Sequence, residues 1–442
     1  MTLLSPATAY LPGRRARADL MRLESAAILK RFFFCEEALL RGAAGWLPAI
    51  APLELKLTLP RHIWQAAQNA ESLRARVLEL RYPNRLIEVG DDAPLVTLFE
   101  AARHAPDAAA YLAGLVRVLI PALGRAYRAY LAVADDLGDG PTKRFLDLAA
   151  REKEAQAAEL EPLLSALLAA SDPATRARAD GWAGALVQRM AALDGLSLAG
   201  PAAGPSDPLP GSVPFTLVQA PSRDSRFHLC RFYWPDIVDP TYPYGDGVAL
   251  QLRSAISHLN EVWAVEAAGA VLEACGPTLG WEFVADAARW VYDESRHALM
   301  GWTRLRDWGF DPQELPLGSY IYDSARGQDP LYRLAMLFYF ETKNIGKKPK
   351  RAEAFASYGD AASQHDMEFD WADESIHAGY GKRWLSALIA AQGLPPERFE
   401  AVRQRCEGLV AAVVASASPA EVADTRAVAT ALIARATALA RG

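Results

Sequence analysis

The sequence predicts an all-α protein in which a four-helix bundle follows a second helical bundle. Long segments rich in Ala, Leu, Glu and Arg carry apolar residues three and four positions apart, and strand-like alternation is almost absent. One stretch, residues 195–247, holds nine prolines and therefore cannot be helical in its interior. This stretch separates an N-terminal helical domain, residues 1–194, from a C-terminal domain, residues 248–442, whose bundle is followed by extra helices.

Composition narrows the classes of function. A chain of 442 residues that is 51% hydrophobic can bury a large core, and a net charge of −6 offers no overall basic face to nucleic acid or anionic lipid. The four cysteines are scattered, the N-terminus lacks the apolar centre of a signal peptide, and no stretch reaches the roughly 18 apolar residues of a membrane span. We therefore expect a cytoplasmic protein with no membrane segment and no nucleic-acid partner.

The N-terminal domain has long helical segments without a matching set of metal ligands. Glu71 is followed three residues later by Arg74, and Glu152 by Ala155, where a ligating pair would need His. We expect a second bundle without metal that serves packing, dimerisation or substrate enclosure, so a homodimer is left open. A degenerate site is the alternative, and it would use Glu24, Glu36, Glu37 and His62.

The second half of the proline-rich stretch is aromatic. Its aromatic residues are Phe227, Phe232, Tyr233, Trp234, Tyr242 and Tyr244. Such a segment is too apolar to be a free linker. We expect it to lie across a helical surface as a strap or lid.

Four long helices are predicted in the C-terminal domain. The first spans residues 248–274 and ends before "CGP", and the second starts near residue 279 and ends at the Gly-then-Pro stop "DWGFDP". The third begins near residue 331 and ends at "NIGKKPK", and the fourth covers residues 359–392. A further helix is expected at residues 398–417. Four helices of this length suffice for a bundle.

The second and fourth helices carry the same motif. "DESRHALMG" begins at Asp293 and "DESIHAGYG" at Asp373. Residues three apart share a helix face, so Glu294 with His297, and Glu374 with His377, each point a carboxylate and an imidazole in one direction. The surrounding stripe is apolar, so this direction is inward. Unpaired buried charges cost several kcal/mol each, a cost that a pair of metal ions would remove.

The first and third helices supply further carboxylates. Glu341 lies 33 residues before Glu374, and Glu261 lies 33 residues before Glu294, so the two halves of the bundle match. Glu266 lies 28 residues before Glu294 but sits on the more apolar stripe of its helix. The first-helix ligand is therefore Glu261 by spacing, with Glu266 as the alternative.

The order Glu, Glu-x-x-His, Glu, Glu-x-x-His resembles the ferritin-like di-iron carboxylate superfamily. "NEVWAVE", "DESRH" and "DESIH" are most similar to a little-characterised bacterial ferritin-like group with repeated D-E-x-x-H motifs. The resemblance covers about residues 248–392. It implies a ferritin-like four-helix bundle with two iron ions, although manganese or a mixed pair stays open. It also implies the ligands, which would form the catalytic centre: Glu261, Glu294, His297, Glu341, Glu374 and His377. Asn260 stands where the group usually has a second His, which leaves ligation intact but can change the surroundings of the ligands.

The aspartate before each motif glutamate fits a supporting role. A ligating imidazole needs an acceptor for its other N–H, and a carboxylate from a neighbouring helix can supply it. Asp293 and Asp373 would do this, with Arg296 neutralising the added negative charge. The alternative is that all three are solvated surface charges.

The resemblance implies an O2-dependent non-haem di-iron oxidase or hydroxylase that acts on a small organic substrate, with the aromatic strap shaping access. A ferroxidase or other iron-binding protein is one alternative, and a tRNA-modifying hydroxylase-like protein is another. No Rossmann glycine motif, P-loop or haem-attachment motif is present. Electrons would therefore come from a separate donor protein or from the substrate.

Overall fold

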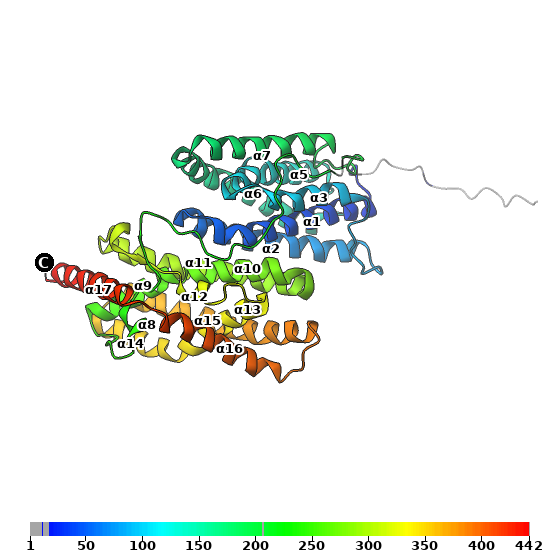
Figure 1. Ribbon diagram of the computed structural model, residues 1–442. Coiled ribbons are helices and arrows are strands. Elements are labelled where there is room, and N and C mark those ends of the chain that lie inside the picture. Colours follow the sequence, from blue (N-terminus) through cyan, green and yellow to red (C-terminus); the bar gives the residue numbers. More distant parts are fainter. Residues whose placement is uncertain (1–10, 12–16, 206, 442) are drawn as a thin grey trace, which may run out of the picture.

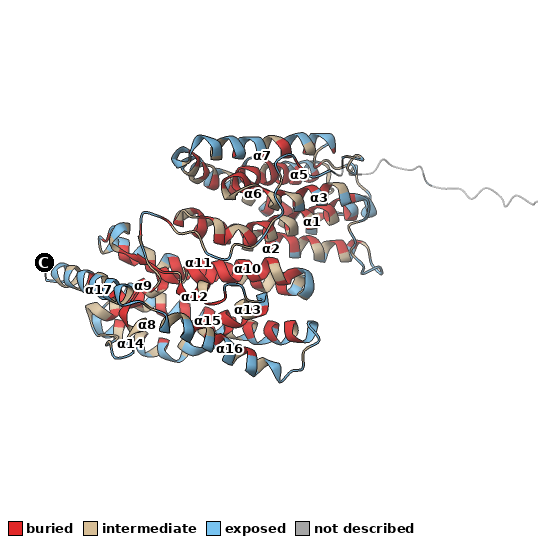
Figure 2. Cartoon of the chain, viewed as in Figure 1, coloured by how far each residue is buried: buried red, intermediate tan, exposed pale blue. Residues whose placement is uncertain are grey.

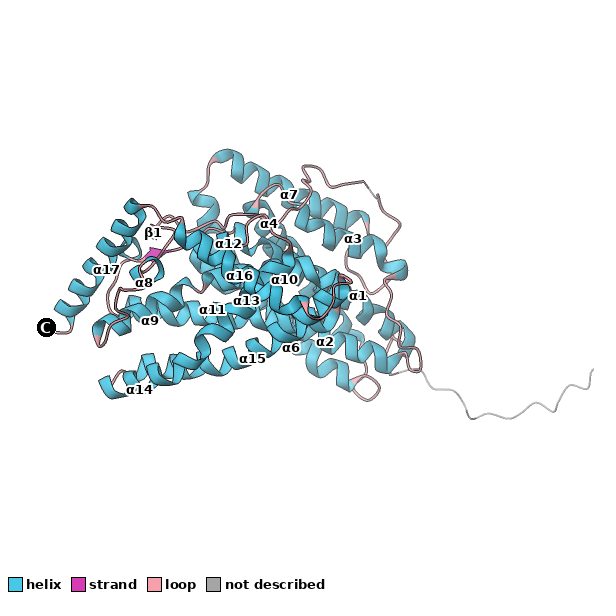
Figure 3. Cartoon of the chain, turned by 60° about the horizontal axis from the view of Figure 1, so that its bottom comes forward, coloured by secondary structure: helices cyan, strands magenta, loops and turns pink. Residues whose placement is uncertain are grey.

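The computed structural model describes residues 11, 17–205 and 207–441, and this part of the chain is almost entirely helical (Figures 1 and 3). Its only strands are β1 (His228–Leu229) and β2 (Pro316–Leu317), which pair in parallel across the described residues. The prediction of an all-α protein is confirmed.

The N-terminal bundle is built from helices α1 to α7. Their bounds are α1 Arg22–Trp46, α2 Leu53–Leu80, α3 Ala93–Ala101, α4 Ala108–Gly114, α5 Ile120–Val133, α6 Gly140–Ala170 and α7 Pro173–Ala192. The long helices α1, α2 and α6 bury apolar residues at three- and four-residue spacing, as the sequence predicts.

The C-terminal half contains helices α8 to α17. Their bounds are α8 Pro235–Val238, α9 Val248–Asn260, α10 Val262–Leu279, α11 Trp281–Asp307, α12 Tyr320–Ser324, α13 Pro330–Asn344, α14 Lys348–Tyr358, α15 Ala361–Ala391, α16 Arg398–Ala415 and α17 Pro419–Leu439. Helices α10 and α15 each pack against both α11 and α13, and α9 packs against α11.

The first of the four predicted helices is divided in two. It runs as α9 and α10, which meet at Glu261, whose backbone N–H donates to the carbonyl of His258 at 2.9 Å instead of to the residue four positions back. The other three predicted helices agree with α11, α13 and α15 to within a few residues, and the further helix at 398–417 is α16. The tightened turn places Glu261 at the joint between two helical segments.

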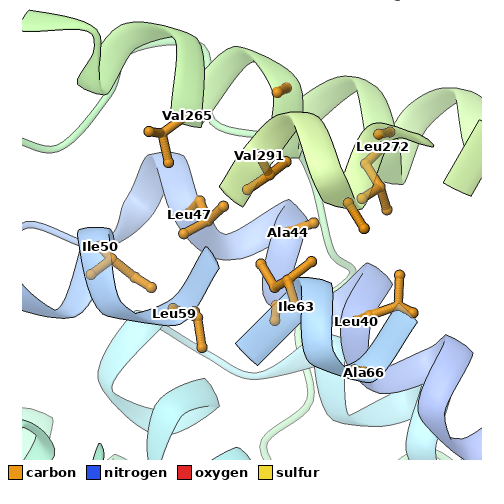
Figure 4. Packing of buried hydrophobic residues seen from close by; sticks show 14 of the residues in the cluster. Leu40, Ala44, Leu47, Ile50, Leu59, Ile63, Ala66, Val265, Leu272 and Val291 are labelled. Carbon is orange, nitrogen blue, oxygen red and sulfur yellow. The ribbon is translucent and has the colours of Figure 1, made fainter. Parts of the chain in front are cut away.

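The two halves share one hydrophobic core. Helices α1 and α2 of the first half pack against α10 and α11 of the second, where buried residues are concentrated (Figures 1 and 2). Leu47 and Ile63 from the N-terminal bundle face Val265 and Val291 from the C-terminal one (Figure 4). Helices α10 and α11 of the C-terminal bundle are therefore packed against the N-terminal bundle.

One helical stretch is long and apolar enough to cross a membrane. It is Ala108–Val133, which comprises α4, a π-helical segment (Leu115–Leu119) and α5. Arg117 and two further arginines interrupt its apolar residues. Since 78% of its most apolar window is buried inside the protein, it has the character of a core helix.

The proline-rich segment lies across both bundles. Its first half is fixed to the N-terminal bundle, where the backbone N–H of Val213 donates to the carbonyl of His104 at 2.8 Å and that of Ser222 to Pro48 at 2.8 Å. Its second half buries Phe232 and Trp234. The segment is thus packed as a strap, as its composition predicts.

Candidate metal centre

All six residues predicted as ligands lie together in the C-terminal bundle. The joint of α9 and α10 contributes Glu261, α11 contributes Glu294 and His297, α13 contributes Glu341, and α15 contributes Glu374 and His377. Five of the six are at most 5% exposed, and the Glu261 side chain is 19% exposed. The matched 33-residue spacing thus does bring the two halves of the motif face to face.

The ligand atoms form two adjoining groups, and within each group they lie within 4.8 Å of one another. One group consists of Glu294, Glu341, Glu374 and His377, and the other of Glu261, Glu294 and His297. The carboxylate of Glu294 belongs to both: its Oε1 lies 3.1 Å from Nδ1 of His377 and its Oε2 lies 3.6 Å from Nδ1 of His297. A single carboxylate therefore faces both imidazoles.

Glu374, like Glu294, belongs to two groups of potential ligands. It belongs to the group with Glu341 and also to a further group with His297 and Asp370, and its Oε1 lies 3.8 Å from Nδ1 of His297. The two motif glutamates are thus placed between the imidazoles, where each could bridge two cations. Glu261 and Glu341 stand at opposite ends.

Each imidazole is oriented by the aspartate of the other motif copy. Nε2 of His297 lies 3.3 Å from Oδ2 of Asp373, and Nε2 of His377 lies 3.4 Å from Oδ2 of Asp293. Arg296 donates to Asp293 at 2.6 Å and to Asp373 at 3.0 Å. With Asp293 fully buried and Asp373 only 6% exposed, the alternative that these are solvated surface charges is wrong.

The inner atoms of the ligands lie close together without forming hydrogen bonds. Nδ1 of His297 lies 3.3 Å from Oε2 of Glu261, and Nδ1 of His377 lies 3.1 Å from Oε1 of Glu294. Both imidazole nitrogens and Oε2 of Glu261 are nevertheless buried without a hydrogen bond among the residues that the structure describes. Unpaired buried polar atoms are costly and uncommon in folded proteins. Because all three face the carboxylate groups described above, the donor set fits bound metal ions.

Burial and mutual repulsion shift the pKa values inside the cluster. Burial, reinforced by the charges of Glu374 and Glu294, holds the pKa of Glu341 well above its usual range. Burial also raises the pKa of Glu374. Burial opposes ionisation of Glu294 too, but its contacts with the two imidazoles outweigh this and lower its pKa. Without metal, the cluster therefore retains protons that metal ions would displace.

Glu266, the alternative ligand, is not part of the cluster. It is fully buried, and its Oε1 accepts hydrogen bonds from the Lys56 ammonium of α2 and the Arg223 guanidinium of the strap. Lys56 also donates to the carbonyl of Ser222 at 2.6 Å. Glu266 thus joins the two bundles and the strap, and the choice between the two glutamates falls on Glu261.

Asn260 also points away from the cluster. Its Nδ2 donates to the carbonyl of Pro316 at 3.0 Å, and its Oδ1 accepts from the backbone N–H of Gly318 at 2.7 Å. The residue that departs from the resembled group therefore fixes the loop at β2 instead of contacting a ligand.

Four buried polar residues beside the cluster were not predicted. Asp370 lies one turn before Glu374 on α15. Both of its carboxylate oxygens accept hydrogen bonds from the Lys348 ammonium, at 2.5 and 2.6 Å, and the same ammonium lies 3.3 Å from Glu374. On the other side, Nε2 of His258 lies 3.2 Å from Asp370, and its Nδ1 lies 2.5 Å from a guanidinium nitrogen of Arg304. The four-residue spacing from Asp370 to Glu374 was a usable signal, whereas nothing local distinguished Lys348 in "GKKPK" from a surface lysine.

The N-terminal bundle uses its candidate ligands differently. Glu36 is buried against the Lys153 ammonium at 2.7 Å, and Tyr127 donates to it at 2.8 Å. Glu24 accepts from the backbone N–H of Met21 at 2.7 Å at the start of α1, and Nε2 of His62 lies 3.0 Å from Glu159. No group of potential ligands is found in this bundle among the described residues.

A cavity of about 320 Å³ opens onto the cluster. Its floor includes Glu261, Glu294, Glu341, Asp370 and Glu374. The strap contributes a wall through four residues, namely Tyr233, Asp236, Ile237 and Tyr244. The site therefore combines a buried polar cluster with a space large enough for a small molecule.

Comparison with known proteins adds a family match. Residues 222–413 match the family described as "Protein of unknown function (DUF455)". The matched segment begins within the strap and contains every residue of the cluster. No curated protein and no solved structure matches the chain. The chain is thus similar to this family over the part that holds the site.

The raised imidazole pKa values predict how metal stabilisation depends on pH. Burial would lower the pKa of His377 from 6.5, but Asp293 and Glu294 outweigh it and raise the pKa to about 9. In the metal-free protein the protonated imidazole of His377 therefore adds to the free energy of unfolding. This contribution is fully present below pH 6.5 and is lost as the pH rises through about 9. A metal ion binds only the neutral imidazole. For each proton that the metal displaces, the metal affinity therefore rises roughly tenfold per pH unit over this range.

The rise in Tm on anaerobic addition of Mn²⁺ should therefore be larger near pH 8.5 than near pH 6.5. Lys56, whose buried ammonium has its pKa lowered to about 8, contributes equally with and without metal and cancels in the difference. Calorimetry of metal-loaded and chelator-treated protein at both pH values measures the effect. A stabilisation that is equal at both, or larger at pH 6.5, would refute this assignment of the imidazoles.

Proposed function

We propose that the protein is an O2-dependent non-haem di-iron oxidase or hydroxylase that acts on a small organic substrate, built on a ferritin-like four-helix bundle. The observation that carries the proposal is the pair of facing ligand groups, in which two unpartnered imidazole nitrogens point at shared carboxylates. Four packed helical segments each supply ligands, in the order found in ferritin-like di-metal proteins.

The charge of the cluster supports two divalent ions. Its carboxylates are Glu261, Glu294, Glu341, Asp370 and Glu374. Two divalent cations together with the Lys348 ammonium would balance these five negative charges. Oxygen-dominated ligation with two imidazoles suits iron, with manganese as the other candidate. When bound, a pair of ferrous ions supplies the electrons that dioxygen needs for reduction.

The residues of the chain itself provide orientation and enclosure. Asp293 and Asp373 fix the imidazoles so that Nδ1 faces the cluster, and Trp290 donates to Glu294 at 2.9 Å. The strap and aromatic side chains form walls of the cavity that opens onto the carboxylates. A cavity of about 320 Å³ with aromatic walls favours a small organic substrate over the iron-storage alternative.

Reaction of the ferrous protein with O2 tests the proposal. The wild type should consume O2 with a change in its optical spectrum, and Glu294→Ala should reduce the rate by roughly 100-fold or more because both ligand groups lose a shared carboxylate. Glu282→Ala, an exposed acid on the same helix, is the control and should behave like the wild type.

Two results would count against an oxidase or hydroxylase. The first is a wild type that binds no iron or manganese, or a Glu294→Ala variant that retains the O2 reaction. The second is an O2 reaction that only releases ferric ions with added ferrous ion as substrate, which would identify a ferroxidase.

A further inference from the structure

One arginine in the wall of the cavity has a free donor. Arg253 of α9 is 7% exposed, and its Nε and one terminal nitrogen donate to Asp236 of the strap at 3.0 and 3.2 Å. The other terminal nitrogen, Nη1, is buried and has no partner among the described residues. A guanidinium N–H that is buried without an acceptor is costly, so this position is suited to an anionic ligand group.

Further cationic side chains line the cavity together with Arg253. Tyr244 holds two guanidinium groups over its ring, Arg253 at 4.9 Å and Arg351 at 4.8 Å from the centroid. Lys347 and Lys343 line the same cavity and are exposed. Among the described residues, Asp236 is the one acid that the strap contributes to the cavity lining, and it is already paired with Arg253. The other acids of the lining belong to the metal cluster. The cationic side chains around Tyr244 therefore attract a negatively charged group.

The remaining walls are aromatic and apolar. They are formed by Tyr233, Tyr244, Trp263, Tyr320, Phe340, Ile321, Val410 and Val414. Flat apolar walls of this kind accommodate a planar organic body by stacking and by burial of apolar surface. The cavity volume of about 320 Å³ is at the lower end of the range for small-molecule sites.

We infer that the substrate is a small organic acid whose carboxylate is held by Nη1 of Arg253 and whose planar apolar body lies against the aromatic walls, facing the metal cluster. This inference rests on the proposed function, because it assigns the substrate class of the same site. Arg253 is the residue that selects the anion, and the strap takes part because its Asp236 holds Nε and Nη2 of the guanidinium and leaves Nη1 without a partner among the described residues.

Calorimetric binding of three simple probes to the full-length protein tests the inference. The probes are benzoate, benzamide, which has the same shape without the charge, and acetate, which has the charge without the ring. Benzoate should bind roughly tenfold or more tightly than either of the other two, because a charge-assisted hydrogen bond and ring burial both contribute. Arg253→Gln should abolish the preference for benzoate over benzamide, and Arg253→Lys should restore part of it.

The controls separate this inference from the proposed function. Arg405→Gln, at an exposed arginine on α16, should leave binding unchanged, and Lys347→Gln, an exposed change with little risk to folding, should weaken benzoate binding by roughly threefold. Each titration is repeated on metal-loaded and chelator-treated samples of known metal content. If metal is bound but benzoate shows no preference, or a preference insensitive to Arg253→Gln, the inference fails and the metal proposal stands. If Arg253-dependent binding occurs in a protein that takes up no metal, the metal proposal fails and the anion site stands.

Discussion

Glu266→Ala is expected to lower the free energy of unfolding by about 3–5 kcal/mol while the metal content per folded chain stays unchanged. The substitution removes the only carboxylate among the described residues that contacts both Lys56 and Arg223, so two buried cations would face each other without an anion. Because these two residues come from α2 and from the strap, the loss affects the interface between the bundles. Denaturant unfolding combined with metal analysis measures both quantities.

Glu54→Ala is the matched control. Glu54 is an acid on α2 that pairs with Arg226 of the strap, but the two side chains are 42% and 52% exposed. Exposed ion pairs contribute about 0–1 kcal/mol, so this variant should unfold almost like the wild type. A Glu266→Ala protein of normal stability that loses metal would show that Glu266, and not Glu261, is the ligand.

Gly301→Ala is expected to destabilise the C-terminal bundle by roughly 1–3 kcal/mol and to reduce metal binding. A Cβ at Gly301 would meet the backbone of Ala255 and Leu259 on α9, and it would lie 2.8 Å from Cβ of His258. Helix α9 would have to move away from α11, and Glu261 at its end would move with it. The last position of the second motif copy is also crowded, since a Cβ at Gly381 would lie 2.7 Å from the ring of Phe338.

Gly379→Ala provides the comparison within the same motif. Gly379 lies on the exposed face of α15, and a Cβ there would meet no atom within 4 Å. Replacing an exposed helical glycine with alanine should raise stability by up to about 1 kcal/mol. Thermal unfolding and metal content of the two variants test the prediction, which is refuted if Gly301→Ala is as stable as Gly379→Ala and retains full metal.

Much of the fold could be predicted because it is encoded locally. Helical periodicity and the proline-rich stretch identified the helices and the strap, and the repeated motif with its 33-residue spacing identified residues that the structure brings together. The spacing was informative because the two helix pairs are antiparallel and of similar length. Residues separated by the same number of positions in each pair then lie at the same height along the bundle axis. The reciprocal use of Asp293 and Asp373 followed from the chemistry of a ligating imidazole.

Other features of the site depend on tertiary packing and could not be predicted from the sequence. Glu261 and Glu266 could not be separated by sequence because the partner of Glu266 is Lys56, more than 200 residues away on another bundle. The tightened turn at Glu261 is likewise invisible in the helical pattern of residues 248–274. Lys348 looked like part of a basic helix stop, and only the fold carries its ammonium to Asp370.

The number of metal ions bound per chain tests the central claim most directly. Chelator-treated protein would be titrated anaerobically with Fe²⁺, and bound metal would be measured after removal of free ions. Two equivalents per chain are expected for the wild type, with at least one lost in Glu261→Gln and none lost in the Glu54→Ala control. A wild-type protein that binds no metal, or one that still binds two equivalents after His297 and His377 are both replaced by Ala, would contradict the claim.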